Sequence, residues 1–288
     1  MRTTTVLKKM MTERRAIPVP GAANALFARV VEATGFECVY LTGAGIANMS
    51  LGAPDIGLTT MTEIADTLAA VADAVSVPII VDADTGFGNA LNVVRCTRVF
   101  ERYGAAAMQL EDQVFPKKCG HFEGKQVISQ TAMVAKIKAA VDTRRDPDFQ
   151  IIARTDSLAL EGIDHAIERA VAYVEAGADV TFVEAPTTEA ELARITTEVG
   201  APQVANIVFG GKTPDLGQKG FAKLGFSIVL YANAVLQAAL KVSFDVLNVL
   251  RKEGSLAGTA SRLVSFDERQ KAVAKWQWDE LYRRFSED

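Results

Sequence analysis

Cysteine and histidine are scarce in this chain, with three cysteines and two histidines among 288 residues. The cysteines, Cys38, Cys96 and Cys119, are odd in number and far apart. This usage favours a reducing cytoplasm over a disulfide framework, so we expect a cytoplasmic protein. The net charge is only −4, which gives no electrostatic reason to expect a nucleic-acid partner.

Long apolar runs are equally rare. The first ten residues carry Arg2, Lys8 and Lys9, and no apolar core follows, so no signal peptide is expected. A transit peptide is the alternative to the short leading helix that we favour for this basic, threonine-rich start. Residues 224–240 lack charge, but they contain Asn233 and Gln237 and divide into a strand-like and a helix-like half. We predict soluble core there and no membrane partner.

Glycine-rich nucleotide motifs are also missing. Gly43-Ala44-Gly45 is not followed by the third glycine of a dinucleotide fingerprint. Gly211-Lys212-Thr213 has Asn206 where a phosphate loop requires glycine.

The chain does have strand-like apolar runs that alternate with amphipathic helical stretches. The strands are expected at residues 16–20, 38–42, 78–84, 106–112, 149–156, 179–185, 203–208 and 226–231. The helices are expected at residues 25–34, 62–75, 90–103, 130–144, 164–176, 188–199 and 216–224. Near-continuous apolar strands indicate a parallel sheet covered by helices. Eight such units predict a (β/α)8 barrel, with a doubly wound sheet as the alternative.

Two regions are expected along the chain. Residues 1–240 would form the catalytic barrel, and residues 241–288 a helical extension that ends in Trp276, Trp278 and Tyr282. These aromatic residues need an apolar partner, either the barrel or another subunit.

Acidic residues collect where the predicted strands end, which is where a barrel carries its chemistry. Asp82 and Asp84 are two apart on one strand and share a face, Glu111 ends the next strand, and Asp55 lies on a preceding loop. These oxygens suit Mg²⁺, with Mn²⁺ as a substitute, and we predict Asp82, Asp84 and Glu111 as metal ligands. The alternative is that the acids cap helices or bind structural cations.

Other polar residues at the strand ends predict a substrate site. The planar guanidinium of Arg154 suits a substrate carboxylate, although a salt bridge to a nearby acid is an equal use of it. Substrate oxygens could bind the hydroxyls of Tyr40 and Thr42, which could instead satisfy one another. The further candidates are Asp55, which would orient substrate or a water, and the backbone amides of Gly43 and Ala44. Glu184 and Asn206 could hold His121, Arg154 or substrate.

The segment Lys117-Lys118-Cys119-Gly120-His121 places a thiol among three potential cations. Such surroundings favour thiolate, so Cys119 could act as a proton carrier or a nucleophile. Residues 113–127 predict a lid with glycines on either side of His121; the alternative is an ordinary exposed loop. We expect His165 on a helix surface, and Cys38 and Cys96 in the core.

At these residues the chain resembles the isocitrate lyase and phosphoenolpyruvate mutase superfamily. The resemblance runs from about residue 21 to residue 240, and its main segments are Tyr40-Leu41-Thr42-Gly43-Ala44-Gly45, Val81-Asp82-Ala83-Asp84-Thr85-Gly86-Phe87-Gly88, Glu111-Asp112-Gln113, Lys117-Lys118-Cys119-Gly120-His121 and Ile152-Ala153-Arg154-Thr155-Asp156. It implies a barrel, a required Mg²⁺, and a homotetramer of two dimers that exchange the last barrel helix.

The Lys-Lys-Cys-Gly-His segment resembles the lyase branch, which splits a 2-hydroxy diacid into a 2-oxo acid and a carboxylate. The resemblance implies that Cys119 protonates the enolate carbon, with Lys117 and His121 as further catalytic residues beside Arg154 and Glu111. It also implies that Gly120 contributes to substrate binding. Phe122 follows Cys-Gly-His where methylisocitrate lyases tend to carry arginine, which favours a dicarboxylate such as 2,3-dimethylmalate. The alternatives are 2-methylisocitrate lyase, oxaloacetate hydrolase and a catalytically silent barrel that binds a carboxylate.

Overall fold

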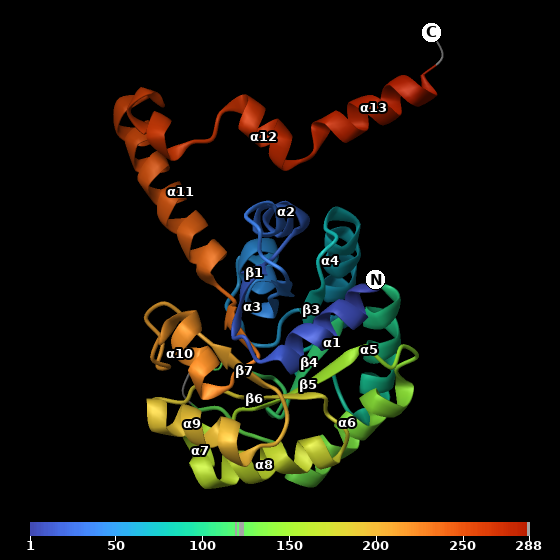
Figure 1. Cartoon of the computed structure of the whole chain (residues 1–288). Helices are drawn as coiled ribbons and strands as arrows, with labels where there is room; N and C mark the ends of the chain where they lie inside the picture. Colours follow the sequence, from blue (N-terminus) through green and yellow to red (C-terminus); the bar gives the residue numbers. More distant parts are fainter. Residues whose placement is uncertain (119, 121–123, 287–288) are drawn as a thin grey trace.

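The computed structural model describes residues 1–118, 120 and 124–286. Eight parallel strands close into a barrel in the order of the chain, which confirms the predicted (β/α)8 fold (Figure 1). The strands are β1 (Ile17–Ala22), β2 (Val39–Leu41), β3 (Ile79–Asp82), β4 (Ala107–Glu111), β5 (Gln150–Thr155), β6 (Val180–Val183), β7 (Gln203–Asn206) and β8 (Ile228–Tyr231). Each lies within one of the predicted runs except β1, which continues for two residues beyond it.

Helices cover the outside of the barrel. They are α2 (Ala25–Ala33), α4 (Met61–Ala74), α5 (Ala90–Arg102), α6 (Gln130–Thr143), α8 (Ile163–Glu175), α9 (Glu189–Glu198) and α10 (Gly217–Leu224). Short helical turns, α3 (Gly43–Ile46), a π-helix (Ala47–Leu51) and α7 (Leu158–Glu161), follow β2 and β5. Five of these seven covering helices begin at a side chain that caps their first amides; Thr60, for example, forms a capping box with Glu63 at the start of α4.

The expected leading helix is α1 (Thr3–Glu13). Leu7, Met10 and Met11 of this helix are buried, and they pack with strand residues such as Ile17 and Val19 that face the interior. The Ser227 hydroxyl, just before β8, donates to the Met11 carbonyl at 2.6 Å. The helix therefore closes the amino-terminal end of the barrel and leaves the opposite end open for a site.

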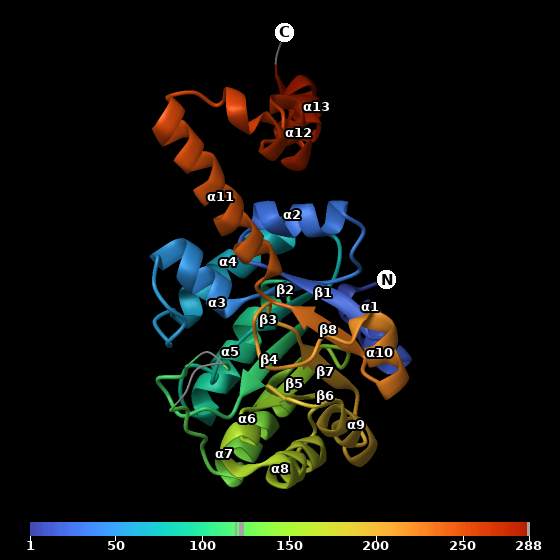
Figure 2. The ribbon, with the colours of Figure 1, turned by 90° about the vertical axis from the view of Figure 1, so that its left-hand side faces the viewer.

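The carboxyl-terminal part extends away from the barrel (Figures 1 and 2). It consists of α11 (Ala234–Glu253), a 3₁₀ turn (Ala257–Arg262), α12 (Phe266–Ala272) and α13 (Lys275–Phe285). Helix α11 is continuous across residue 240. Large apolar side chains are exposed here, including Phe244, Trp276, Trp278, Tyr282 and Phe285. Among the described residues, no helix has both the length and the apolar character needed to cross a membrane.

Candidate active site

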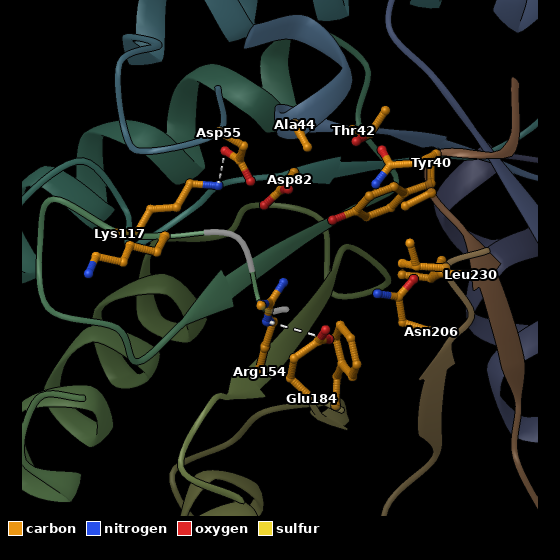
Figure 3. Close-up of a pocket in the computed structure, with 16 residues that line it drawn as sticks. Tyr40, Thr42, Ala44, Asp55, Asp82, Lys117, Arg154, Glu184, Asn206 and Leu230 are labelled. Atoms are coloured by element: carbon orange, nitrogen blue, oxygen red, sulfur yellow. Dashed lines mark ion pairs between the residues drawn. The ribbon is translucent and has the colours of Figure 1, made fainter. Parts of the chain in front are cut away.

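A small cavity lies at the carboxyl-terminal ends of the strands (Figure 3). Its volume is about 40 Å³, room for only a few water molecules at roughly 10–15 Å³ each. The predicted site residues Tyr40, Thr42, Ala44, Asp55, Asp82, Lys117, Gly120, Arg154, Glu184 and Asn206 line it, with Lys118, Phe182, Val208, Leu230, Ala232 and Asn233. The structure thus brings together most residues that the sequence analysis singled out.

One side of the cavity is acidic. Asp82 ends β3, and its carboxylate accepts the backbone amides of Gly43 at 3.3 Å and Asp84 at 3.1 Å. Asp84 follows in a left-handed conformation, φ 45°, which aspartate tolerates better than most residues. The buried ammonium of Lys117 lies between two carboxylates, 2.5 Å from Asp55 and 2.7 Å from Asp84. The Gly43 amide, predicted to bind substrate, is directed at Asp82.

Burial sets the electrostatics of this side. It raises the pKa of Asp84 to about 7, even though the Lys117 ammonium acts in the opposite direction. Burial also raises the pKa of Glu111 well above its usual value, against the effect of Arg154. For Lys117 burial disfavours the charge, but Asp84 and Glu111 outweigh it and raise its pKa. The acids therefore lie where a positive charge is favoured.

These residues fit a divalent cation. Within the described part of the chain, no three Asp, Glu, His or Cys side chains converge as a ready metal group. Mg²⁺, however, is usually held by one or two carboxylates and several waters. Asp82 and Asp84 supply two carboxylates, and the buried Oε1 of Glu111 accepts no hydrogen bond from any described residue. Such an oxygen suits a metal-bound water.

The facing side of the cavity is basic. Arg154 on β5 binds Asp156 through two hydrogen bonds, Nε to Oδ2 at 2.9 Å and Nη2 to Oδ1 at 3.0 Å. Glu184 lies 4.0 Å from the same guanidinium, which also stacks over the Phe182 ring with Cζ 5.3 Å from its centroid. Burial disfavours the Arg154 charge, but Asp156 and Glu111 outweigh it and raise the pKa of the guanidinium. The salt-bridge alternative for Arg154 therefore holds, and the same side chain also lines the cavity.

The neutral residues lie between the two sides. The Tyr40 hydroxyl accepts a hydrogen bond from Nε2 of Gln109 at 2.9 Å. The Thr42 hydroxyl caps α3 by accepting the Gly45 amide at 3.2 Å. These two hydroxyls therefore have partners other than each other. Asn206 ends β7, and its buried Oδ1 accepts no hydrogen bond from any described residue, as expected of a group that awaits a ligand.

Cys119, His121 and Phe122, singled out from the sequence, lie outside the described residues. Three other predictions are confirmed. Cys38 and Cys96 are buried free thiols, and burial raises the pKa of each. His165 lies exposed on α8 beside Glu168, at 3.3 Å.

Sequence reasoning gave no site role to Lys125, Asp156 or Asn233. In the sequence, Asp156 is the last residue of a predicted strand, and Lys125 is one lysine in a long predicted loop. The buried Oδ1 of Asn233, which also accepts no hydrogen bond from a described residue, follows β8 in a span interpreted as core. Strand-end position was the available signal for Asp156 and Asn233.

A family model described as phosphoenolpyruvate phosphomutase matches residues 7–250. The chain belongs to this family. Within the family it is 45% identical over 268 residues to the 2,3-dimethylmalate lyase of Eubacterium barkeri, with 93% of each chain covered. It is 46% identical over 250 residues to the 2-methylisocitrate lyase of Aeropyrum pernix, covering 87% of this chain and 80% of that one.

The chain is also similar to solved structures. A phosphonopyruvate hydrolase in complex with oxalate and Mg²⁺ has a TM-score of 0.89 and 29% identity, with 99% of each chain covered. These matches confirm the predicted superfamily and the predicted lyase class.

Proposed function

We propose that this family member is a Mg²⁺-dependent lyase that cleaves a 2-hydroxy dicarboxylate of the 2,3-dimethylmalate type between C2 and C3. The observation that carries the proposal is that Asp82 and Arg154, a candidate metal ligand and a candidate carboxylate-binding cation, line one cavity at the carboxyl-terminal ends of the strands (Figure 3). The similarity to a 2,3-dimethylmalate lyase over 93% of the chain supports it.

The acidic side would hold the metal. Asp82 and Asp84 would bind it, and Glu111 would bind one of its waters. Lewis acidity toward the C1 carboxylate and the C2 hydroxyl is the chemistry that Mg²⁺ supplies when bound. Lys117 already compensates Asp55 and Asp84, so it would keep these acids ionised and oriented in the closed site.

The basic side would hold the rest of the substrate. Arg154, kept in one orientation by Asp156, would bind the second carboxylate, and Tyr40 and Asn206 would bind oxygens with their polar groups. When the C2–C3 bond breaks, the hydroxyl proton leaves to a base, C2 becomes a carbonyl, and the bonding electrons remain on C3. Cys119 would then deliver a proton to C3, as the family resemblance implies.

The uncharged wall supports a dicarboxylate. Asn206, Val208 and Leu230 are uncharged residues of the cavity lining and offer no charge for a third carboxylate. An aliphatic substituent at C3 of the substrate fits this wall. The similarity to 2-methylisocitrate lyases makes a tricarboxylate the second candidate.

A panel of diacids tests the proposal. With Mg²⁺ and lactate dehydrogenase coupling, 2,3-dimethylmalate should release pyruvate with kcat/KM at least tenfold above that for 2-methylisocitrate, the usual worth of one contact of about 1.4 kcal/mol. Oxaloacetate should give little oxalate and acetate. A preference for 2-methylisocitrate would replace the substrate assignment, and no turnover with any of the three would favour a silent barrel.

The exposed apolar side chains on α11 and α13 support a homotetramer of two dimers that exchange this region. Phe244 and Leu247 on α11 and Trp276 and Trp278 on α13 are large apolar side chains exposed on the monomer, and such exposure is typical of residues that enter an interface. Sedimentation should then give about four times the 30.9 kDa chain mass; a monomer at micromolar concentration would contradict it. We propose a cytoplasmic location from the sparse cysteines.

A further inference from the structure

Lys125 is a buried lysine in the loop between β4 and α6, and it makes two contacts. Its Nζ donates to the Gly120 carbonyl at 2.5 Å and lies 2.9 Å from Oδ1 of Asp156. The Lys125 side chain is only 3% exposed, and that of Asp156 is fully buried. A lysine without neighbours pays a large desolvation cost in such a place, so both contacts are needed to keep it there.

Asp156 connects Lys125 to Arg154. Its Oδ1 accepts from both Lys125 Nζ and Arg154 Nη2, and its Oδ2 accepts from Arg154 Nε. Although burial favours the neutral acid, Arg154 and Lys125 outweigh it and lower the pKa of Asp156. One carboxylate thus fixes two cations relative to each other.

Gly120 closes this set of contacts into a ring. A Cβ placed on Gly120 would lie 2.5 Å from Oε1 of Glu184 and 2.6 Å from Nη2 of Arg154. The Gly120 backbone therefore rests directly on the guanidinium of Arg154, a distance only glycine permits. Lys125 holds the same backbone through its hydrogen bond to the Gly120 carbonyl.

The loop is also fixed at its base. Gln113 and Val127 pair as an antiparallel bridge, and the Val114 amide donates to the Gln126 carbonyl at 2.8 Å. The Gln113 side chain binds both the amide and the carbonyl of Lys118, at 3.0 and 2.8 Å. Between these anchors, Lys125 holds Gly120, the residue whose backbone lies against Arg154.

We propose that Lys125 is a positioning residue: it holds the Gly120 backbone directly and Arg154 through Asp156, and so fixes these two cavity-lining residues relative to each other. This inference rests on the proposed lyase function of that cavity. Lys125 is not itself among the residues that line the cavity; it contacts the lining residue Gly120 directly and reaches the lining residue Arg154 through Asp156. Its loss should reduce turnover more than substrate binding, because a displacement near 1 Å costs about 10²-fold in rate.

The test compares Lys125→Met with Lys125→Arg and with Arg144→Met in the full-length protein with Mg²⁺. Arg144 forms a partly buried ion pair with Asp179, at 2.5 Å, at the opposite end of the barrel. Its loss therefore controls for general destabilisation. We expect Lys125→Met to lower kcat about 10²-fold with KM changed less than threefold, Lys125→Arg to recover to within about tenfold of wild type, and Arg144→Met to keep wild-type kcat.

Hydrogen exchange provides a readout independent of turnover. In Lys125→Met the amides of the described loop residues 113–118, 120 and 124–127 should exchange at least tenfold faster, while strands β1–β8 keep their protection. Wild-type kcat and exchange in this variant, or an equal loss of kcat in Arg144→Met, would overturn the proposal. If the wild-type protein cleaves no diacid, the proposed function fails, whereas the local exchange change still decides whether Lys125 positions the loop.

Discussion

Glu111 and Arg154 face each other across neighbouring strands of the barrel. They are register partners of β4 and β5, and Nη1 of Arg154 lies 3.4 Å from Oε2 of Glu111. The pair joins the acidic side of the cavity to its basic side at buried positions. Substrate charge at either side therefore changes the field at the other, because interactions between buried charges are weakly screened.

Removal of divalent metal should abolish turnover. EDTA is expected to stop pyruvate release and Mg²⁺ to restore it, because the Lewis acid that would polarise the C1 carboxylate and the C2 hydroxyl is then removed. Asp82→Asn should weaken Mg²⁺ binding by at least about tenfold in calorimetry, in line with losses seen when metal-site partners are changed. Asp66→Asn, on the exposed face of α4, serves as the control. Full activity in EDTA would show that cleavage does not require a divalent metal.

The proton-transfer step should depend on Cys119. Cys119→Ser is expected to lower kcat by roughly 10²–10⁴-fold, the usual contribution of a placed general acid. Oxalate binding in the presence of Mg²⁺ should change little, since the variant leaves the described cavity residues intact. Steady-state kinetics measure the change in kcat, and calorimetry measures oxalate binding. Unchanged kcat would assign the proton to another group.

The guanidinium shape of Arg154 should matter beyond its charge. Arg154→Lys cannot make the paired contacts to Asp156, so kcat/KM should fall by roughly 10–100-fold, mostly through KM. Arg194→Lys provides a matched control, because Arg194 makes similar paired contacts to Glu198 on the exposed side of α9, at 2.6 and 3.1 Å. Equal kinetics in the two variants would remove Arg154 from substrate binding.

The barrel seam between β1 and β8 should be intolerant of added volume. A Cβ on Gly21 would lie 1.9 Å from the Ala232 backbone carbonyl oxygen, and this backbone has no flexible end that can move aside. Gly21→Ala should therefore lower the free energy of unfolding by at least about 2 kcal/mol or prevent folding. Gly200→Ala, whose Cβ would meet no atom within 4 Å, should be close to neutral in the same urea titration.

The barrel was predictable because its signals are local. Each strand is a short run of buried apolar residues, and glycines such as Gly35, Gly104, Gly177 and Gly225 mark the turns after helices. The cavity residues were predictable because strand ends of a barrel converge on one face. Small differences in where a strand or helix begins or ends do not affect these two predictions.

Other features depend on contacts between distant residues. The ion pair of Lys125 with Asp156 spans 31 positions, and no local pattern indicates it. The sequence associated Lys117 with the Cys119 thiol, whereas the structure shows its ammonium between Asp55 and Asp84. The π-helix at Ala47–Leu51 likewise follows from how the loop after β2 packs, and its composition does not distinguish it from an ordinary helical turn.

The most direct measurement is proton NMR of the products formed from 2,3-dimethylmalate in D₂O with Mg²⁺. Cleavage between C2 and C3 followed by protonation at C3 predicts pyruvate and propionate in equal amounts, with a single deuterium at C2 of the propionate. Formation of neither product from any stereoisomer, or of products that retain the C2–C3 bond, would contradict the account.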